Sequence, residues 1–108
     1  KDKLAVTWGK IKQNSLYQNY PNPFNPETWI PYQLAEPTDV NIYIYTESGQ
    51  LVRKLGLGLK EAGSYLERSK AGYWDGKNEA GEPVRSGIYF YAIDANVFSD
   101  TKKMLIIR

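Results

Sequence analysis

The amino-acid sequence contains no cysteine and no histidine among its 108 residues. Ser-His-Asp and Cys-His catalytic arrangements therefore cannot form, and neither can zinc sites of the usual ligand types. No apolar run approaches the roughly 18 residues that a membrane-spanning helix needs, which predicts a soluble chain without a transmembrane segment. These absences predict a protein that is not an enzyme and that binds no cofactor and no metal.

Positive charge is also absent from a long stretch of the chain. Lysines crowd the first residues, but no Lys or Arg lies between Lys12 and Arg53. The net charge is only +2, whereas nucleic-acid-binding domains usually carry a clustered basic surface, so we expect no nucleic-acid partner. The chain starts at Lys1 with neither an initiator Met nor a signal peptide, which we interpret as a piece cut from a longer precursor.

Short segments of alternating apolar and polar residues predict an all-β fold. Ile30, Tyr32 and Leu34 alternate with other residues and predict one strand face, although Pro31 within this run favours an edge strand or a bulge. Several such segments, separated by turn signals, are typical of an antiparallel β-sandwich or a small barrel. The further strands expected are 40–45, 51–59, 64–69, 73–75, 87–95 and 101–107.

The first 26 residues are expected to behave differently from the rest. Leu4, Trp8 and Ile11 share one face of a short helix, which is too short to be stable unless it docks. We therefore interpret residues 1–14 as a linker or a short docking helix, and residues 15–108 as the folded domain. Prolines exclude a helix over residues 19–26, so we expect an ordered opening loop there, anchored by Tyr20 and Phe24.

Acidic residues in the turns offer two alternatives to a purely structural role. Carboxylates of the kind that serve glycosidases are present, but their turn-like contexts favour solvated surface charge. The run from Asp75 to Glu79 superficially matches a calcium loop, but it lacks the spacing of oxygen ligands. A turn in which Asp75 and Asn78 bond their own backbone is the favoured interpretation. The adjacent Trp74 is expected to anchor the core.

Aromatic residues exceed what a single core requires, because both faces of some predicted strands are apolar. Trp29, Tyr43 and Tyr45 fall on the faces opposite to the predicted core, and in the strand over 87–95 both faces are apolar, with Phe90 on the face opposite to Tyr89 and Tyr91. The favoured interpretation is a second cluster covered by a loop or by the N-terminal segment. The functional alternative is a docking surface for a partner or a sugar. The candidate partner-recognition residues are Trp29, Tyr43, Tyr45, Phe90, Lys102 and Lys103.

Several motifs together resemble the C-terminal sorting domains of the type IX secretion system. The most specific is the opening run over residues 16–28, LYQNYPNPFNPET. Similar motifs occur at residues 48–53, 73–78, 81–84 and 86–91, and the closing run over residues 102–108 fits as well. The portion from Trp74 to Phe90 also resembles the immunoglobulin-like domain of flagellar hook-capping proteins. The segment 4–13 has no counterpart in this resemblance.

The resemblance implies an immunoglobulin-like antiparallel sandwich of about seven strands, at the C-terminus of a much larger exported protein. Such a domain is a non-catalytic sorting or surface-anchoring signal. Its implied partners are outer-membrane secretion and anchoring proteins and the parent protein upstream in the same chain. The implied location is secreted or on the cell surface, reached through the periplasm. The alternative function is a structural or adhesive module that binds carbohydrate or a partner protein.

Overall fold

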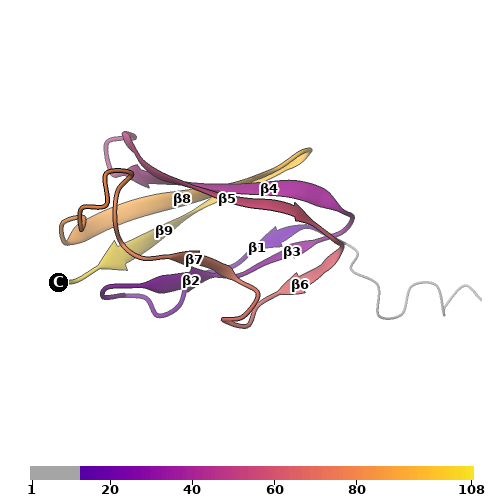
Figure 1. The fold of residues 1–108 in the computed structure, drawn as a ribbon, viewed down its shortest axis with the longest axis horizontal. Coiled ribbons are helices and arrows are strands. Elements are labelled where there is room, and N and C mark those ends of the chain that lie inside the picture. Colours follow the sequence, from indigo (N-terminus) through magenta and orange to yellow (C-terminus); the bar gives the residue numbers. More distant parts are fainter. Residues whose placement is uncertain (1–12) are drawn as a thin grey trace, which may run out of the picture.

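The computed structural model describes residues 13–108, which form nine strands and no helix. The strands make two layers that pack face to face (Figure 1). One layer is an antiparallel sheet of four strands in the order β5-β4-β8-β9. The strand bounds are β4 Thr38–Thr46, β5 Leu51–Lys60, β8 Gly87–Ala95 and β9 Phe98–Ile106.

The other layer is built from five shorter strands. A three-stranded sheet has the order β1-β3-β6, and a two-stranded sheet pairs β2 with β7. The bounds are β1 Ser15–Leu16, β2 Thr28–Ile30, β3 Tyr32–Leu34, β6 Gly63–Tyr65 and β7 Gly72–Trp74. The expected immunoglobulin-like sandwich is confirmed. The N-terminal helix expected over residues 4–11 lies outside the described residues.

Two interruptions explain why nine strands are present where about seven are typical of the fold. Pro31 separates β2 from β3, so the break falls where proline disfavoured a regular strand. On the strand that pairs with β3 and β2, the pairing ends at Tyr65 of β6 and resumes at Gly72 of β7. If β2 with β3 and β6 with β7 are each counted as one broken strand, the sandwich has the expected number of about seven strands. The strand predicted over 64–69 is wrong beyond Tyr65, because Lys70 and Ala71 both donate backbone hydrogen bonds to the Glu67 carbonyl and form a turn instead.

The core lies between the layers and follows the predicted alternation. Val40, Ile42 and Ile44 of β4 are completely buried, and so are the residues predicted to face the core from β2 and β3. Trp74 is also completely buried, as predicted, and its ring contacts that of Phe24 with centroids 5.5 Å apart. Because these residues come from both layers, the hydrophobic effect holds the sandwich together across its full width.

The opening loop is ordered and joins the last strand. The Phe24 amide donates to the Leu105 carbonyl at 3.0 Å, and the Ile107 amide donates to the Phe24 carbonyl at 3.1 Å. Phe24 is buried, as expected of an anchor, whereas Tyr20 is only half-buried on the outside of the second layer. The opening run over residues 16–28 and the closing run over residues 102–108 therefore form one structural unit.

A buried polar network fixes the same loop to β8. The Tyr91 hydroxyl donates to the Tyr17 carbonyl at 2.7 Å and accepts from the Asn19 amide at 2.8 Å. The Asn19 side chain in turn donates to the Thr28 hydroxyl at 3.0 Å. Burial raises the pKa of Tyr91 above its ordinary value. The motif residues Asn19 and Thr28 thus have a structural role.

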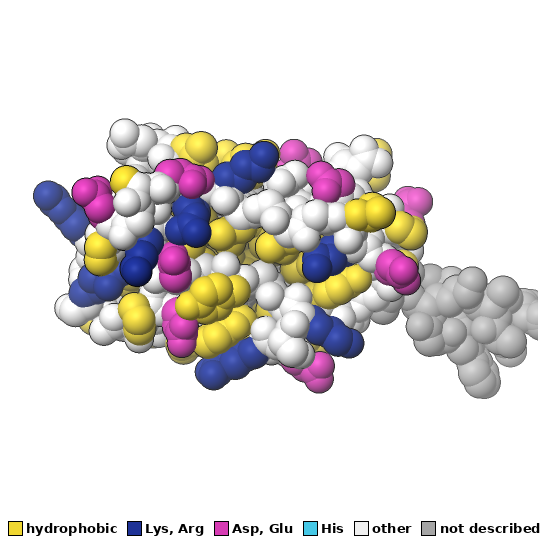
Figure 2. Space-filling view, viewed as in Figure 1, with side chains coloured by type: hydrophobic (Ala, Val, Ile, Leu, Met, Phe, Trp, Pro, Cys, Tyr) yellow, Lys and Arg dark blue, Asp and Glu magenta, His cyan; other side chains and the backbone are white. Residues whose placement is uncertain are grey.

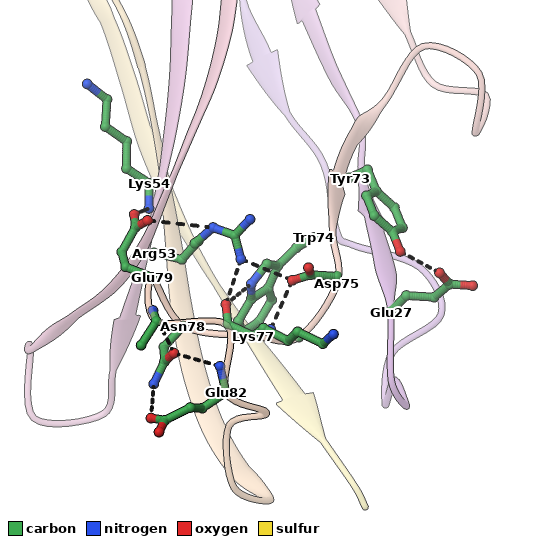
Figure 3. A network of polar contacts seen from close by, with 12 residues as sticks. Glu27, Arg53, Lys54, Tyr73, Trp74, Asp75, Lys77, Asn78, Glu79 and Glu82 are labelled. Carbon is green, nitrogen blue, oxygen red and sulfur yellow. Dashed lines mark hydrogen bonds and ion pairs between the residues drawn. The ribbon is translucent and has the colours of Figure 1, made fainter.

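The loop after β7 is held by side chains that bond the backbone (Figure 3). The Lys77 amide donates to Asp75 at 3.0 Å, and Asn78 accepts from the amides of Ala80 and Glu82, also at 3.0 Å. The predicted turn is therefore confirmed. Arg53 forms an ion pair with Asp75 at 3.1 Å, which ties the loop to β5.

No helix long and apolar enough to cross a membrane occurs within residues 13–108. On the face seen in Figure 2, charged side chains of both signs are interspersed with apolar ones, and no extended surface of a single sign forms.

Candidate interaction surface

The outward face of the four-stranded sheet carries a row of aromatic side chains. Tyr43 and Tyr45 of β4 point away from the core because they alternate with buried residues. Tyr45 lies opposite Phe90 of β8, so this ring shares the face. The two tyrosine rings are 6.4 Å apart and nearly parallel, at 28°. All three side chains are half-buried, so part of each ring is accessible to solvent.

Two lysines flank the aromatic row on its outer sides. Lys54 of β5 lies opposite Tyr43, with its ammonium 5.9 Å from the ring centroid. Lys103 of β9 lies opposite Phe90. Neither forms an ion pair with another residue of the described part of the chain. We name the surface made by Tyr43, Tyr45, Phe90, Lys54 and Lys103 the aromatic face.

A polar hollow adjoins the aromatic face at one end. The hollow has a volume of about 480 Å³ and is open to solvent. Asn41 and Asp94 lie opposite each other on β4 and β8, on the same side of the sheet as Tyr43. The lining side chains include two carboxylates and two amides, all of which can bind hydroxyl groups. The hollow is lined by Pro37, Thr38, Asp39, Asn41, Asp94 and Asn96.

The other outward face, on the second layer, also carries an aromatic cluster. Trp29 lies between Tyr20 and Tyr73, with ring centroids 6.4 and 5.5 Å away. The guanidinium of Arg68 lies 4.1 Å above the Trp29 ring. Arg68 belongs to the loop of residues 66–71, which leaves the sheet between β6 and β7, and the Tyr20 hydroxyl donates to the Leu66 carbonyl of this loop. The protein's own loop therefore lies over one side of the Trp29 ring, which remains half-buried.

Tyr73 at the margin of this cluster remains exposed. Its hydroxyl donates to the Glu27 carboxylate at 2.7 Å (Figure 3). This hydrogen bond to Glu27 raises the pKa of Tyr73 above its ordinary value. A tyrosine held in this way acts as a hydrogen-bond donor.

The edges of the four-stranded sheet are partly closed to other strands. On the β5 edge, the Glu79 carboxylate accepts the Lys54 backbone amide at 2.8 Å. On the β9 edge, Asn22 accepts the Leu105 amide at 2.9 Å, and Gln18 donates to the Lys103 carbonyl at 2.8 Å. Side chains that bond an edge in this way block the addition of another strand. At these positions a partner is therefore better accommodated by a face than by an edge.

The six predicted recognition residues fall into three places. Tyr43, Tyr45, Phe90 and Lys103 come together on the aromatic face, as one surface. Lys102 lies opposite Tyr91, whose side chain faces the core, so it is on the other side of the sheet from Lys103. Adjacent residues of a strand point to opposite faces, so the two lysines do not share one surface. Trp29 lies in the other layer.

Asp75, one of the carboxylates considered for chemistry, forms an ion pair with Arg53. No group of three or more His, Cys, Asp or Glu residues within residues 13–108 is placed to hold a metal ion. The sequence interpretation missed Lys54 and the polar hollow, because both depend on the pairing of distant strands.

These features define the chain as an immunoglobulin-like domain with an aromatic cluster on each of its two outward faces. The sequence model of the FlgD Ig-like domain matches residues 26–97, which is more than half of the chain. The chain therefore belongs to the FlgD Ig-like domain family. No curated protein matches the sequence closely enough to count as a relative.

Three solved structures are similar to the domain. Dimeric latent PorU from Porphyromonas gingivalis has a TM-score of 0.64 and 20% identity, over 90% of this chain and 10% of PorU. PorZ, described as an essential surface component of the type IX secretion system of P. gingivalis, has a TM-score of 0.55 and 21% identity, over 87% and 12%. FlgD from P. aeruginosa has a TM-score of 0.56 and 20% identity, over 87% and 66%. At these identities the similarity shows the fold alone.

Proposed function

We propose that this domain is a non-catalytic module of a larger exported protein, recognised by outer-membrane secretion machinery as a sorting or surface-anchoring signal. The observation that carries the proposal is the difference between the two outward faces. The guanidinium of Arg68 lies 4.1 Å above the Trp29 ring, whereas the Lys54 ammonium lies farther from the Tyr43 ring, at 5.9 Å from its centroid. An uncovered aromatic surface flanked by charges is typical of an interaction site.

The opening motif supports the assignment to the type IX system. Its residues are not a flexible tag but part of the fold, because Phe24 pairs with the last strand and Asn19 is buried. A receptor would therefore read a folded domain whose opening loop and last strand are joined. The resemblance of this motif to sorting domains, and the similarity in fold to a PorZ domain, both favour this partner class.

The size of the chain supports its role as an appended module. It spans only about a tenth of the PorU and PorZ chains to which it is similar. A domain of this size, without a catalytic cluster in its described part, fits an attachment to a larger protein that carries the activity. Export through the periplasm to the medium or the cell surface is part of the proposal.

Secretion of a fused reporter tests the proposal. A monomeric fluorescent protein with a periplasmic export signal would carry residues 1–108 at its C-terminus, in a bacterium that has a type IX system. We expect the reporter in the medium or on the surface, and in the periplasm of an isogenic strain without the translocon. A reporter that stays in the periplasm of both strains, or leaves both equally, contradicts the proposal.

A matched pair of variants locates the recognition surface in the same assay. Lys103→Glu reverses a charge on the aromatic face, and we expect it to reduce secretion several-fold. Lys70→Glu makes the same charge reversal in the loop of residues 66–71, on the other face, and we expect it to leave secretion unchanged. Lys70 and Lys103 are both exposed. Equal thermal stability of the two purified variants would show that secretion, rather than folding, has changed.

A further inference from the structure

The aromatic face and the polar hollow together have the composition of a carbohydrate-binding surface. Along β4, Tyr45, Tyr43, Asn41 and Asp39 occupy successive outward positions, so the aromatic rings lead directly into the hollow. Aromatic rings contact the C–H face of a sugar ring, and carboxylates and amides bind its hydroxyl groups. We propose that this continuous surface binds a neutral polysaccharide chain.

The charge distribution favours a neutral ligand over a charged one. The basic side chains of the surface are Lys54 and Lys103, and the acidic ones are Asp39 and Asp94. Their charges cancel, and the two signs lie at opposite ends of the surface. A nucleic acid or an acidic polysaccharide would meet the carboxylates, and a basic partner would meet the lysines. A neutral, polyhydroxylated chain meets no repulsion at either end.

The shape of the sheet also favours an extended ligand. Gly56 of β5 lies opposite Asn41 and adds no side chain beside that part of the hollow, whereas the exposed Leu59 lies opposite Asp39. Ala92 of β8 lies opposite Tyr43 and is the smallest outward side chain of that strand's central part. Small residues therefore lie beside Asn41 on β5 and beside Tyr43 on β8, whereas Lys54 lies beside Tyr43 on β5.

The proposal goes beyond the proposed sorting function and fails independently of it. Glycan binding is measured with the purified chain and does not require a translocon. The secretion assay, conversely, does not require a glycan. A chain that is secreted but binds no glycan overturns only the present inference, and a chain that binds glycan but is not secreted overturns only the sorting function.

The test is a titration of the ¹⁵N-labelled 108-residue chain with neutral hexasaccharides. The probes are cellohexaose, xylohexaose, mannohexaose and laminarihexaose, followed by two-dimensional NMR spectra. We expect at least one to shift the amide signals of β4 and β8 around Tyr43, Asn41 and Asp94. No shift with any probe at millimolar concentration overturns the proposal, as does a response confined to the neighbourhood of Trp29.

Variants decide which side chains are responsible. Tyr43→Ala should weaken binding by about tenfold or more, whereas Tyr73→Ala, an exposed tyrosine of the other layer, should leave binding unchanged. Gly56→Gln should weaken binding by partly filling the hollow. A Cβ at position 56 meets only Asn41, at 3.5 Å, so this change spares the fold. If Tyr43→Ala abolishes secretion but the parent chain binds no glycan, the surface recognises a protein and the inference is wrong.

Discussion

The two outward faces of this sandwich carry similar aromatic residues but differ in what covers them. On the second layer, Trp29 is stacked beneath Arg68, and the loop of residues 66–71 is fixed over it by the Tyr20 hydroxyl. On the four-stranded sheet, the Tyr43 and Tyr45 rings lie 6.4 Å apart, and the Lys54 ammonium is 5.9 Å from the Tyr43 ring centroid. The comparison shows that an excess of aromatic residues in a sequence does not by itself indicate a binding site. What matters is whether the chain supplies its own cover.

The largest expected effect concerns the core that both faces share. Trp74 and Tyr73 are adjacent on β7 but point to opposite sides, with Trp74 completely buried and Tyr73 45% exposed. Trp74→Ala should lower the free energy of unfolding by about 3–5 kcal/mol, because it leaves a large cavity. Tyr73→Ala should cost less than about 1 kcal/mol. Urea denaturation measures both, and similar losses for the two would contradict the assigned orientation.

A smaller effect is expected at the loop that joins the two layers. Gly76 has a φ of +78°, and a Cβ there would overlap the Pro26 carbonyl oxygen. Gly76→Ala should therefore destabilise by roughly 2–4 kcal/mol through combined strain and overlap. Gly81 has a similar φ of +83° but open space around it, so Gly81→Ala should cost only about 1 kcal/mol. Thermal unfolding of both variants separates the effect of the overlap with Pro26 from the effect of backbone strain. Equal losses of stability in the two variants would show that the contact with Pro26 is unimportant.

Removing the cover of Trp29 tests the comparison of the faces itself. Arg68→Ala should lower stability by about 0.5–1 kcal/mol, the usual value of an exposed cation–π contact. It should also make the Trp29 indole signal more sensitive to a soluble paramagnetic agent in NMR. Lys54→Ala, the matched change on the aromatic face, should cost less, because its ammonium is 5.9 Å from the Tyr43 ring rather than 4.1 Å. If Lys54→Ala lowered the stability more than Arg68→Ala, the aromatic face would be the better covered of the two faces.

The smallest effect is expected from the N-terminal segment. If residues 1–12 dock as a helix through Leu4, Trp8 and Ile11, their deletion should lower the melting temperature by a few degrees. The fluorine signal of 5-fluorotryptophan at position 8 should then show a buried environment in the intact chain. A free-indole signal, with an unchanged melting temperature after deletion, would identify the segment as a linker.

Much of the fold could be predicted from the sequence because strand periodicity is a local property. The alternation in Val40, Ile42 and Ile44 determines which side chains face the core, and Asp75 followed by Asn78 predicts a turn held by its own side chains. The strand β1 was missed, since two residues are too short a run to show any period. The loop of residues 66–71 was also missed, because its sequence resembles the end of a strand until its turn hydrogen bonds are seen.

The candidate site was only partly predictable because it depends on strand register. Asn41 and Asp94 are more than fifty residues apart in the sequence and are brought together only by the pairing of β4 with β8. The separation of Lys102 from Lys103, in contrast, follows from alternation alone and could have been predicted. The cover over Trp29 depends on where a loop folds back, which no local pattern specifies.

The most direct test of the central claim is site-specific photo-cross-linking from the two faces. A photoreactive phenylalanine derivative would replace either Tyr43 or Tyr73 in the reporter fusion, and irradiation would be carried out in a bacterium with a type IX system. Both positions are aromatic and solvent-accessible, but only Tyr43 lies on the uncovered face. We expect a covalent adduct from position 43 and none from position 73. An adduct from position 73, with or without one from position 43, or an adduct from neither position would contradict this expectation.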